Sequence, residues 1–121
     1  MSLEVLAVDD SRTMRDMLNL ALTSAGFTTH LAEDGVHGLE VLDGLEPSVI
    51  ITDINMPRMD GFGFIDAVRS QEKWRGIPIL VLTTESAAEL KVKARAAGAT
   101  GWIVKPFDPS KLVKAIKMVA G

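Results

Sequence analysis

The chain has 121 residues and is 47% hydrophobic, so it is long and apolar enough to form one domain with a buried core. It contains no cysteine, which excludes disulfides and thiolate metal sites and is typical of a reducing compartment. The net charge of −3 is unevenly spread, because residues 1–60 hold 11 acidic and 3 basic side chains and residues 61–121 hold 5 acidic and 10 basic ones.

This distribution argues against a nucleic-acid-binding protein with a wholly basic surface, although the basic half could meet an acidic partner. No apolar run approaches the length that spans a bilayer, and the N-terminus lacks the basic segment of a signal peptide. No linker, repeat or low-complexity segment interrupts the chain. We therefore expect a soluble cytoplasmic protein with a single domain over residues 1–121.

Short apolar runs alternate with longer segments of helical spacing. The runs predict strands at residues 3–8, 28–32, 48–52, 78–82 and 101–104. The first helical face is the clearest, and it is formed by Met14, Met17, Leu18, Ala21, Leu22 and Ala25. Gly26 follows where a helix terminator belongs. A second helix is predicted over residues 35–45, ended by Pro47.

Three more helices complete the pattern. Their periodic apolar residues are Phe64, Ile65 and Val68 in the third and Leu112, Ile116 and Val119 in the fifth. The fourth covers residues 87–97, with Ser86 and Glu89 in capping-box spacing and Gly98 at its end. This repeated alternation predicts an α/β fold, in which helices cover both faces of a doubly wound parallel sheet.

Ligands of such sheets bind at the carboxyl ends of the strands, so the residues that follow each strand are the candidates for a site. These residues are Asp9, Asp10 and Ser11 after the first strand, Glu33 and Asp34 after the second, Asp53 after the third, Thr83 and Thr84 after the fourth, and Lys105 and Pro106 after the fifth. Each also has a structural explanation when taken singly. Asp10, Ser11, Thr83 or Thr84 could cap a helix, Asp53 could form a turn, and Lys105 could be a solvated surface lysine.

Three aspartates at one edge of a sheet repel one another, and each raises the pKa of its neighbours. Stability alone would not favour such a cluster, whereas a divalent cation would relieve the repulsion. Mg²⁺ is the expected ion, because the available ligands are hard oxygens. His30 and His37 lie within strand and helix patterns and are not assigned as ligands.

Four motifs carry a resemblance to a known family. They are "VDDS" after the first strand, "TDINMPRMDG" around the third, "LTTES" at the fourth and "KPF" at the fifth. In this order the motifs resemble the receiver domain of bacterial two-component response regulators, most closely the stand-alone chemotaxis type. The resemblance, which runs from Leu3 to Val119, implies a flavodoxin-like fold with five helices and strand order 2-1-3-4-5.

The resemblance also implies the role of each acidic residue. Asp53 would be the phosphoacceptor, because a carboxylate can act as a nucleophile and form an aspartyl-phosphate. Asp10 would bind Mg²⁺ directly, together with Asp53 and the backbone carbonyl of Asn55. Asp9 would act on the metal through water.

The family places further roles on the neighbouring strand ends. Lys105 would supply a fixed positive charge, and its bond to Pro106 would be cis. Thr83 would donate its hydroxyl to the bound phosphoryl group, and Trp102 would be the aromatic switch residue, where the family more often has Tyr or Phe. Asn55 and Glu85 would tune how fast water removes the phosphoryl group.

A set of basic side chains surrounds Trp102 in sequence and forms the expected partner surface. Its members are Lys91, Lys93, Arg95, Trp102, Lys111, Lys114 and Lys117. The surface could dock an acidic segment of a partner, or it could be a solvated face. Both interpretations stay open from the sequence.

The expected protein is a monomeric phosphoacceptor rather than an enzyme, with intrinsic self-phosphorylation and self-dephosphorylation. Its partners would be a chemotaxis-type histidine kinase, the flagellar motor switch protein and a phosphatase, with no nucleic acid and no membrane. Because no output domain follows the last helix, a phosphate sink and a phosphorelay intermediate are the alternatives.

Proteins of other classes fit the sequence less well. An aspartate-nucleophile phosphatase of haloacid-dehalogenase type needs a second acid where Asn55 stands, and flavodoxin-type flavin binding conflicts with the charges of Asp9 and Asp10. An inactive, docking-only receiver conflicts with the full set of site residues.

Overall fold

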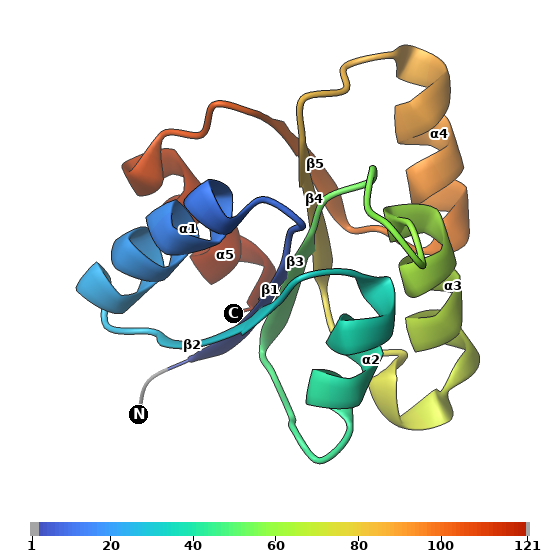
Figure 1. Ribbon diagram of the computed structural model, residues 1–121, viewed down its shortest axis with the longest axis horizontal. Helices are drawn as coiled ribbons and strands as arrows, with labels where there is room; N and C mark the ends of the chain where they lie inside the picture. Colours follow the sequence, from blue (N-terminus) through green and yellow to red (C-terminus); the bar gives the residue numbers. More distant parts are fainter. Residues whose placement is uncertain (1–2, 121) are drawn as a thin grey trace.

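A twisted parallel sheet forms the centre of the molecule in the computed structural model, which describes residues 3–120 (Figure 1). Within these residues it has five strands: β1 (Glu4–Val8), β2 (Thr28–Ala32), β3 (Val49–Thr52), β4 (Ile79–Thr83) and β5 (Gly101–Val104). Their order is β2-β1-β3-β4-β5, and all pairs are parallel. The predicted α/β class and the order implied by the resemblance are confirmed.

Helices cover both faces of this sheet (Figure 1). They are α1 (Arg12–Ser24), α2 (Gly35–Leu42), α3 (Gly61–Ser70), α4 (Ala88–Ala97) and α5 (Pro109–Ala120), with a short 3₁₀ helix, η1 (Glu72–Trp74), that the sequence pattern did not predict. One core lies under α1 and α5 and the other under α2, α3 and α4. The doubly wound arrangement is therefore confirmed.

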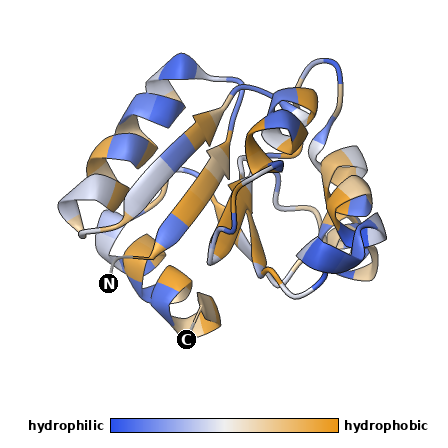
Figure 2. Cartoon of the chain, turned by 90° about the horizontal axis from the view of Figure 1, so that it is seen from below, coloured by the Kyte–Doolittle hydropathy of each residue, from blue (hydrophilic) through white to orange (hydrophobic). Residues whose placement is uncertain are grey.

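The central strands β3 and β4 supply both cores. In β4, Ile79 and Val81 pack on one side of the sheet, and Leu80 and Leu82 pack on the other. Because successive side chains of a strand point to opposite faces, a strand covered on both sides must be apolar almost throughout. Figure 2 shows this contrast between hydrophobic strands and helices with polar outer faces.

Helix ends follow the cap residues of the sequence in some places only. The Ser11 hydroxyl caps α1 by accepting from the Met14 amide at 3.2 Å. This confirms the structural explanation of Ser11 as a helix cap. The helix α2 ends at Leu42, earlier than predicted, because Gly44 turns the chain with φ 89° before Pro47 is reached.

The start of α4 also differs from the prediction. Ala87 is the N-cap residue and offers no side-chain hydrogen bond, so the capping box of Ser86 and Glu89 and the cap by Thr83 or Thr84 are wrong. Gly98 does end α4, in the left-handed conformation at φ 116°. Among the helices of residues 3–120, none is both long and apolar enough to cross a membrane.

Candidate functional site

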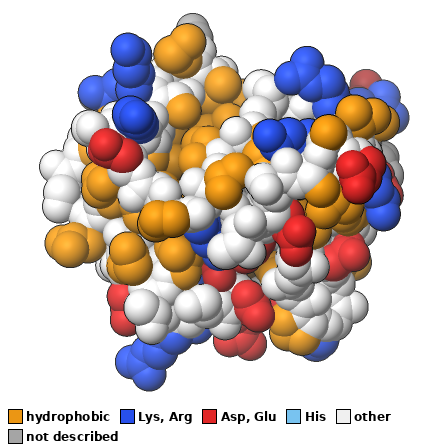
Figure 3. All heavy atoms as spheres, turned by 90° about the horizontal axis from the view of Figure 1, so that it is seen from above, with side chains coloured by type: hydrophobic (Ala, Val, Ile, Leu, Met, Phe, Trp, Pro, Cys, Tyr) orange, Lys and Arg blue, Asp and Glu red, His pale blue; other side chains and the backbone are white. Residues whose placement is uncertain are grey.

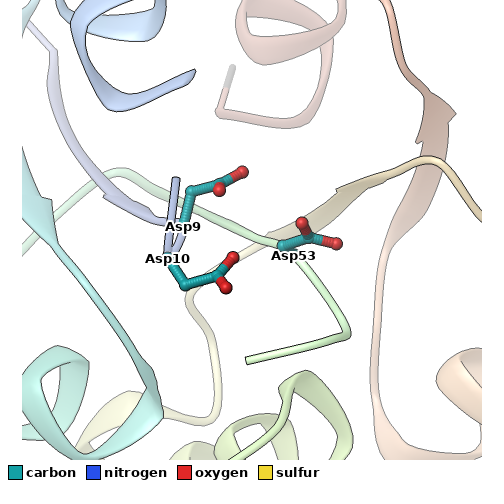
Figure 4. Close-up of side chains that lie close together, drawn as sticks. All are labelled: Asp9, Asp10 and Asp53. Carbon is teal, nitrogen blue, oxygen red and sulfur yellow. The ribbon is translucent and has the colours of Figure 1, made fainter. Parts of the chain in front are cut away.

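Three aspartates meet at the carboxyl edge of the sheet. Asp9 and Asp10 follow β1, and Asp53 follows the neighbouring strand β3, whose Thr52 pairs with Val8. One carboxylate oxygen from each aspartate lies within 4.8 Å of the others (Figure 4). Asp9 and Asp53 are only 2% and 8% exposed, whereas Asp10 is exposed. The parallel register therefore builds the acidic cluster that the sequence predicted.

Lys105 supplies the positive charge of this cluster. It follows β5, which is separated from β3 by β4, so its long side chain extends over the sheet edge. Its Nζ donates to Asp9 Oδ2 and to Asp53 Oδ2, each at 2.7 Å. The peptide bond to Pro106 is cis, as the resemblance implied.

The ionisation of these groups reflects one lysine shared by two buried carboxylates. Burial raises the pKa of Asp9 and outweighs the hydrogen bonds from Lys105 and the Ser11 amide, which lower it. Burial also lowers the pKa of Lys105, but its hydrogen bonds to Asp53 and Asp9 outweigh that effect, and the pKa is raised. Lys105 is therefore a cation at neutral pH, and burial disfavours the ionised form of Asp9.

Backbone groups and one arginine orient the carboxylates. The Ile54 amide donates to Asp53 Oδ1 at 2.7 Å, and the Ser11 amide donates to Asp9 Oδ1 at 2.9 Å. Arg15 of α1 donates through Nη1 to the backbone oxygen of Asp9 at 2.8 Å. No sequence pattern predicted a role for Arg15. Its position one helical turn after Ser11 was the available signal.

The donor set fits Mg²⁺. Three carboxylates converge, they are hard oxygen ligands, and Mg²⁺ takes one or two carboxylates while keeping several waters. Within residues 3–120, Asp10 makes no hydrogen bond or ion pair, so its carboxylate can accept a cation without losing a protein partner. Asp9 and Asp53 would share their charge between that cation and Lys105.

The predicted switch and tuning residues are joined to one another by hydrogen bonds around Glu85. Thr83 is fully buried, and its Oγ1 accepts from the Glu85 amide at 3.3 Å. Asn55 Nδ2 donates to Glu85 Oε1 at 3.1 Å, and Trp102 Nε1 donates to the Glu85 backbone oxygen at 3.0 Å. No hydrogen bond joins Thr83 to Asp53 in the described part of the chain. Glu85 thus connects Asn55 with Trp102.

The predicted partner surface extends over α4, β5 and α5. Its lysines and its arginine are exposed, and Trp102 is half-buried. Lys91, Arg95 and Trp102 border a small cavity of about 110 Å³. Lys93 differs from the other lysines, because its Nζ lies 4.2 Å from the centroid of the Phe62 ring in a cation–π contact. From above, acidic side chains gather in the lower centre and basic ones mostly toward the rim (Figure 3).

Comparison with known proteins agrees with this geometry. The model of the response regulator receiver domain matches residues 5–117. The chain belongs to the family of response regulator receiver domains. Chemotaxis protein CheY1 of Helicobacter pylori is 40% identical over 121 residues, with 98% of each chain covered.

Solved structures show the same likeness. Chemotaxis protein CheY4 of Vibrio cholerae matches with a TM-score of 0.94 and 45% identity, over 98% of this chain and 99% of that chain. The receiver domain of sensor histidine kinase PA1611 from Pseudomonas aeruginosa matches with a TM-score of 0.92 and 25% identity, over 100% of this chain and 99% of that chain, and its structure is described with a magnesium ion in the active site cleft. The chain is a CheY-like receiver domain of the chemotaxis response-regulator type.

Proposed function

We propose that this protein is a phosphorylation-activated, single-domain response regulator that accepts a phosphoryl group on Asp53 from a chemotaxis-type histidine kinase. The observation that carries the proposal is the double contact of Lys105 Nζ, at 2.7 Å from both Asp9 and Asp53, beside three converging carboxylates. The three carboxylates favour a nearby cation, and the ammonium group of Lys105 already lies beside two of them. Positive charge at this position is suited to stabilise the negative charge of a phosphoryl group.

The transfer needs few protein groups. An oxygen of Asp53 attacks the phosphorus, the bond between phosphorus and the donor histidine nitrogen breaks, and the electron pair stays on the imidazole. Lys105 Nζ contacts the Asp53 carboxylate, so it is near enough to contact the phosphoryl oxygens once the group is bound to Asp53. The protein is then a phosphoacceptor that also catalyses its own phosphorylation and dephosphorylation, and not an enzyme acting on other substrates.

Asp10, Asp53 and the backbone carbonyl of Asn55 would hold Mg²⁺, and Asp9 would contribute through water. When bound, the ion neutralises charge on the phosphoryl oxygens. The donor set of the three aspartates supports this assignment, as does the magnesium described in the cleft of the PA1611 receiver domain.

The switch would begin at Thr83. Its hydroxyl would release the Glu85 amide and donate to the phosphoryl group, which would rearrange the loop after β4. The Trp102 indole donates to the Glu85 backbone oxygen in the same loop. A rearrangement of the loop would therefore move the indole, which belongs to the partner surface. Asn55 and Glu85, which are hydrogen-bonded to each other, would set the access of water and give a short-lived phosphoryl group.

The output would be binding to the flagellar motor switch protein in the cytoplasm, by a monomer whose basic surface meets an acidic segment. The uneven charge of the chain and the exposed lysines of α4 and α5 support this partner chemistry. A phosphatase would end the signal. Raising the salt concentration should weaken binding, because exposed charges are screened.

The test is the intact mass of the protein after incubation with acetyl phosphate, with and without Mg²⁺. One phosphoryl adduct that requires both Mg²⁺ and Asp53 is expected, and Asp53→Asn is the matched control. An adduct of equal yield on Asp53→Asn would overturn the assignment. If rapid quenching shows no adduct, the cognate histidine kinase replaces acetyl phosphate, and a second failure would refute phosphorylation.

The partner is tested separately by a pull-down with motor-switch protein, with and without a phosphoryl mimic. Binding that depends on the mimic is expected. Phosphorylation without any motor binding would favour a phosphate sink, and transfer of the phosphoryl group onward to a histidine would favour a relay.

A further inference from the structure

The loop between β3 and α3, residues 53–60, begins with Asp53 and closes directly behind it. The Gly61 amide donates to the backbone oxygen of Ile54 at 2.7 Å. A Cβ atom added to Gly61 would lie 2.2 Å from the backbone oxygen of Asp53, a distance that real Cβ atoms do not adopt. The position of this loop therefore sets where the Asn55 carbonyl lies relative to Asp53.

An ion pair between the exposed Arg58 and the buried Asp34 connects the same loop to the start of α2. Arg58 donates through Nε to Asp34 Oδ2 at 2.8 Å and through Nη2 to Asp34 Oδ1 at 3.0 Å. Asp34 is only 3% exposed, and these hydrogen bonds hold its pKa below the usual range. Two-point contacts of this kind fix geometry as well as charge. Asp34 also caps α2, since its Oδ1 accepts from the His37 amide at 2.8 Å.

The backbone at Arg58 is strained. Its φ of 63° makes it the one non-glycine residue in the left-handed region among residues 3–120. That conformation costs about 1 kcal/mol for an L-residue and persists only where surrounding contacts impose it. Besides the ion pair, the Gly35 amide donates to the Met59 backbone oxygen at 3.2 Å. A Cβ on Gly35 would meet Met59 Cγ at 2.7 Å, so the loop is pressed onto the start of α2.

The segment before α2 also holds Asp9. The Asp9 amide donates to the backbone oxygen of Ala32 at 3.0 Å, two residues before Asp34. The end of β2 thus contacts Asp9, and the residues between β2 and α2 contact the loop with Asn55. Arg58 makes the side-chain connection between that segment and the loop.

We propose that the Arg58–Asp34 pair positions the candidate Mg²⁺ site by fixing the loop that carries Asn55. The inference rests on the proposed function, because it concerns the same metal. Arg58 is a positioning residue, since its guanidinium contacts Asp34 and not the carboxylates of the site. Residues that orient metal ligands change metal affinity about tenfold or more when they are removed.

Arg58→Gln separates positioning from charge. If Arg58 acted only through its charge, its loss would leave the site more negative, and Mg²⁺ would bind more tightly. The proposed positioning role predicts the opposite, a loss of affinity of about tenfold. Asp34→Asn should give a similar loss, because Asn still caps α2 but lacks the charge that holds Arg58. The double variant should be no weaker than either single one.

The experiment is a titration of the full chain with Mg²⁺ alone, followed by calorimetry, with melting temperatures measured in parallel. Arg12→Gln is the control, because Arg12 is an exposed arginine at the start of α1 whose removal changes the charge equally. Arg58→Lys keeps the charge without the two-point contact and should bind Mg²⁺ as weakly as Arg58→Gln.

The outcomes separate this inference from the proposed function. Weaker Mg²⁺ binding in Arg58→Gln and unchanged or tighter binding in Arg12→Gln would support the positioning role. Equal or tighter binding in Arg58→Gln would overturn it, even if the melting temperature falls, because the pair would then be structural only. If the natural chain bound no Mg²⁺, the metal site of the proposed function would fail, and this inference with it.

Discussion

The loops after β3 and β4 leave neighbouring strands at the same edge of the sheet, yet they are held in different ways. The β3–α3 loop is fixed by the Arg58–Asp34 pair and by backbone contacts that leave no room for a side chain at Gly61. The β4–α4 loop is held through Glu85, by hydrogen bonds from Asn55 and Trp102 and by its own bond to Thr83. It then enters α4 without a side-chain cap.

The difference matches the role that we propose for each loop. A nucleophile and its metal ligands must be held within a fraction of an ångström to react, which requires a loop with one conformation. A switch needs a second conformation at small free-energy cost, which requires contacts that can be exchanged one for another. The following variants either break this comparison or sharpen it, from the largest expected effect to the smallest.

Gly61→Ala should destabilise the fold most, by about 3 kcal/mol or more, because the new methyl group would overlap backbone atoms behind Asp53. Urea unfolding measures the effect. Gly76→Ala is the matched control, since a Cβ there meets nothing within 4 Å. Equal stability of the two variants would show that the β3–α3 loop adapts and is not rigid.

Trp102→Phe should cost about 2 kcal/mol, because the Glu85 backbone oxygen loses its donor and the smaller ring loses apolar contact. The amides of residues 84–87 should then exchange hydrogen faster than in the natural chain. The control is Trp74→Phe, because the Trp74 indole nitrogen donates no hydrogen bond within residues 3–120. Faster exchange that is confined to the β3–α3 loop would reverse the comparison.

Ala87→Ser should stabilise the protein by about 1 kcal/mol, because Ala87 is the N-cap of α4 and serine supplies the missing acceptor. The same change should slow the switch, since the start of α4 becomes more costly to rearrange. Thermal unfolding and the yield of the acetyl-phosphate adduct measure the two effects. Ala88→Ser, one residue into the helix, should leave stability within about 0.5 kcal/mol.

The smallest effect is a pH dependence from Asp34, whose pKa the hydrogen bonds from Arg58 lower. The folded state then favours the ionised carboxylate, so its contribution to stability is complete above the unfolded pKa of about 3.9 and is lost as the pH falls through the folded value. The stability difference between the natural chain and Asp34→Asn should therefore be constant near pH 7 and shrink below about pH 4. A difference that shrinks toward alkaline pH would contradict the assignment.

The fold was predictable because its strands are apolar runs and its helices are periodic. The strands at residues 28–32 and 101–104 are confirmed without a shift. Those predicted at 3–8 and 48–52 begin one residue later, and the one predicted at 78–82 is displaced by one residue at both ends. Errors arose where local signals competed. The end of α2 depends on the left-handed conformation of Gly44, and the start of α4 depends on which residue is the N-cap. The periodicity of apolar residues reveals neither of these features.

For the site, position at strand ends was enough to bring Asp9, Asp10, Asp53 and Lys105 together, because parallel strands end at one edge. The contacts of Arg58 with Asp34 could not be predicted in the same way. They depend on the left-handed backbone of Arg58 inside a loop. No periodic pattern in the sequence relates Arg58 to Asp34, so their contact could not be predicted.

Lys105 lies 96 residues after Asp9 and 52 residues after Asp53 along the chain. During synthesis, all three aspartates therefore leave the ribosome long before the lysine that neutralises them. If a nascent chain formed β1 and β3 first, its carboxylates would lie together without that counter-charge until the segment after β5 is made. Chains that stop before Lys105 should therefore be poorly stable, because the charge repulsion among the three aspartates would be left without its lysine partner.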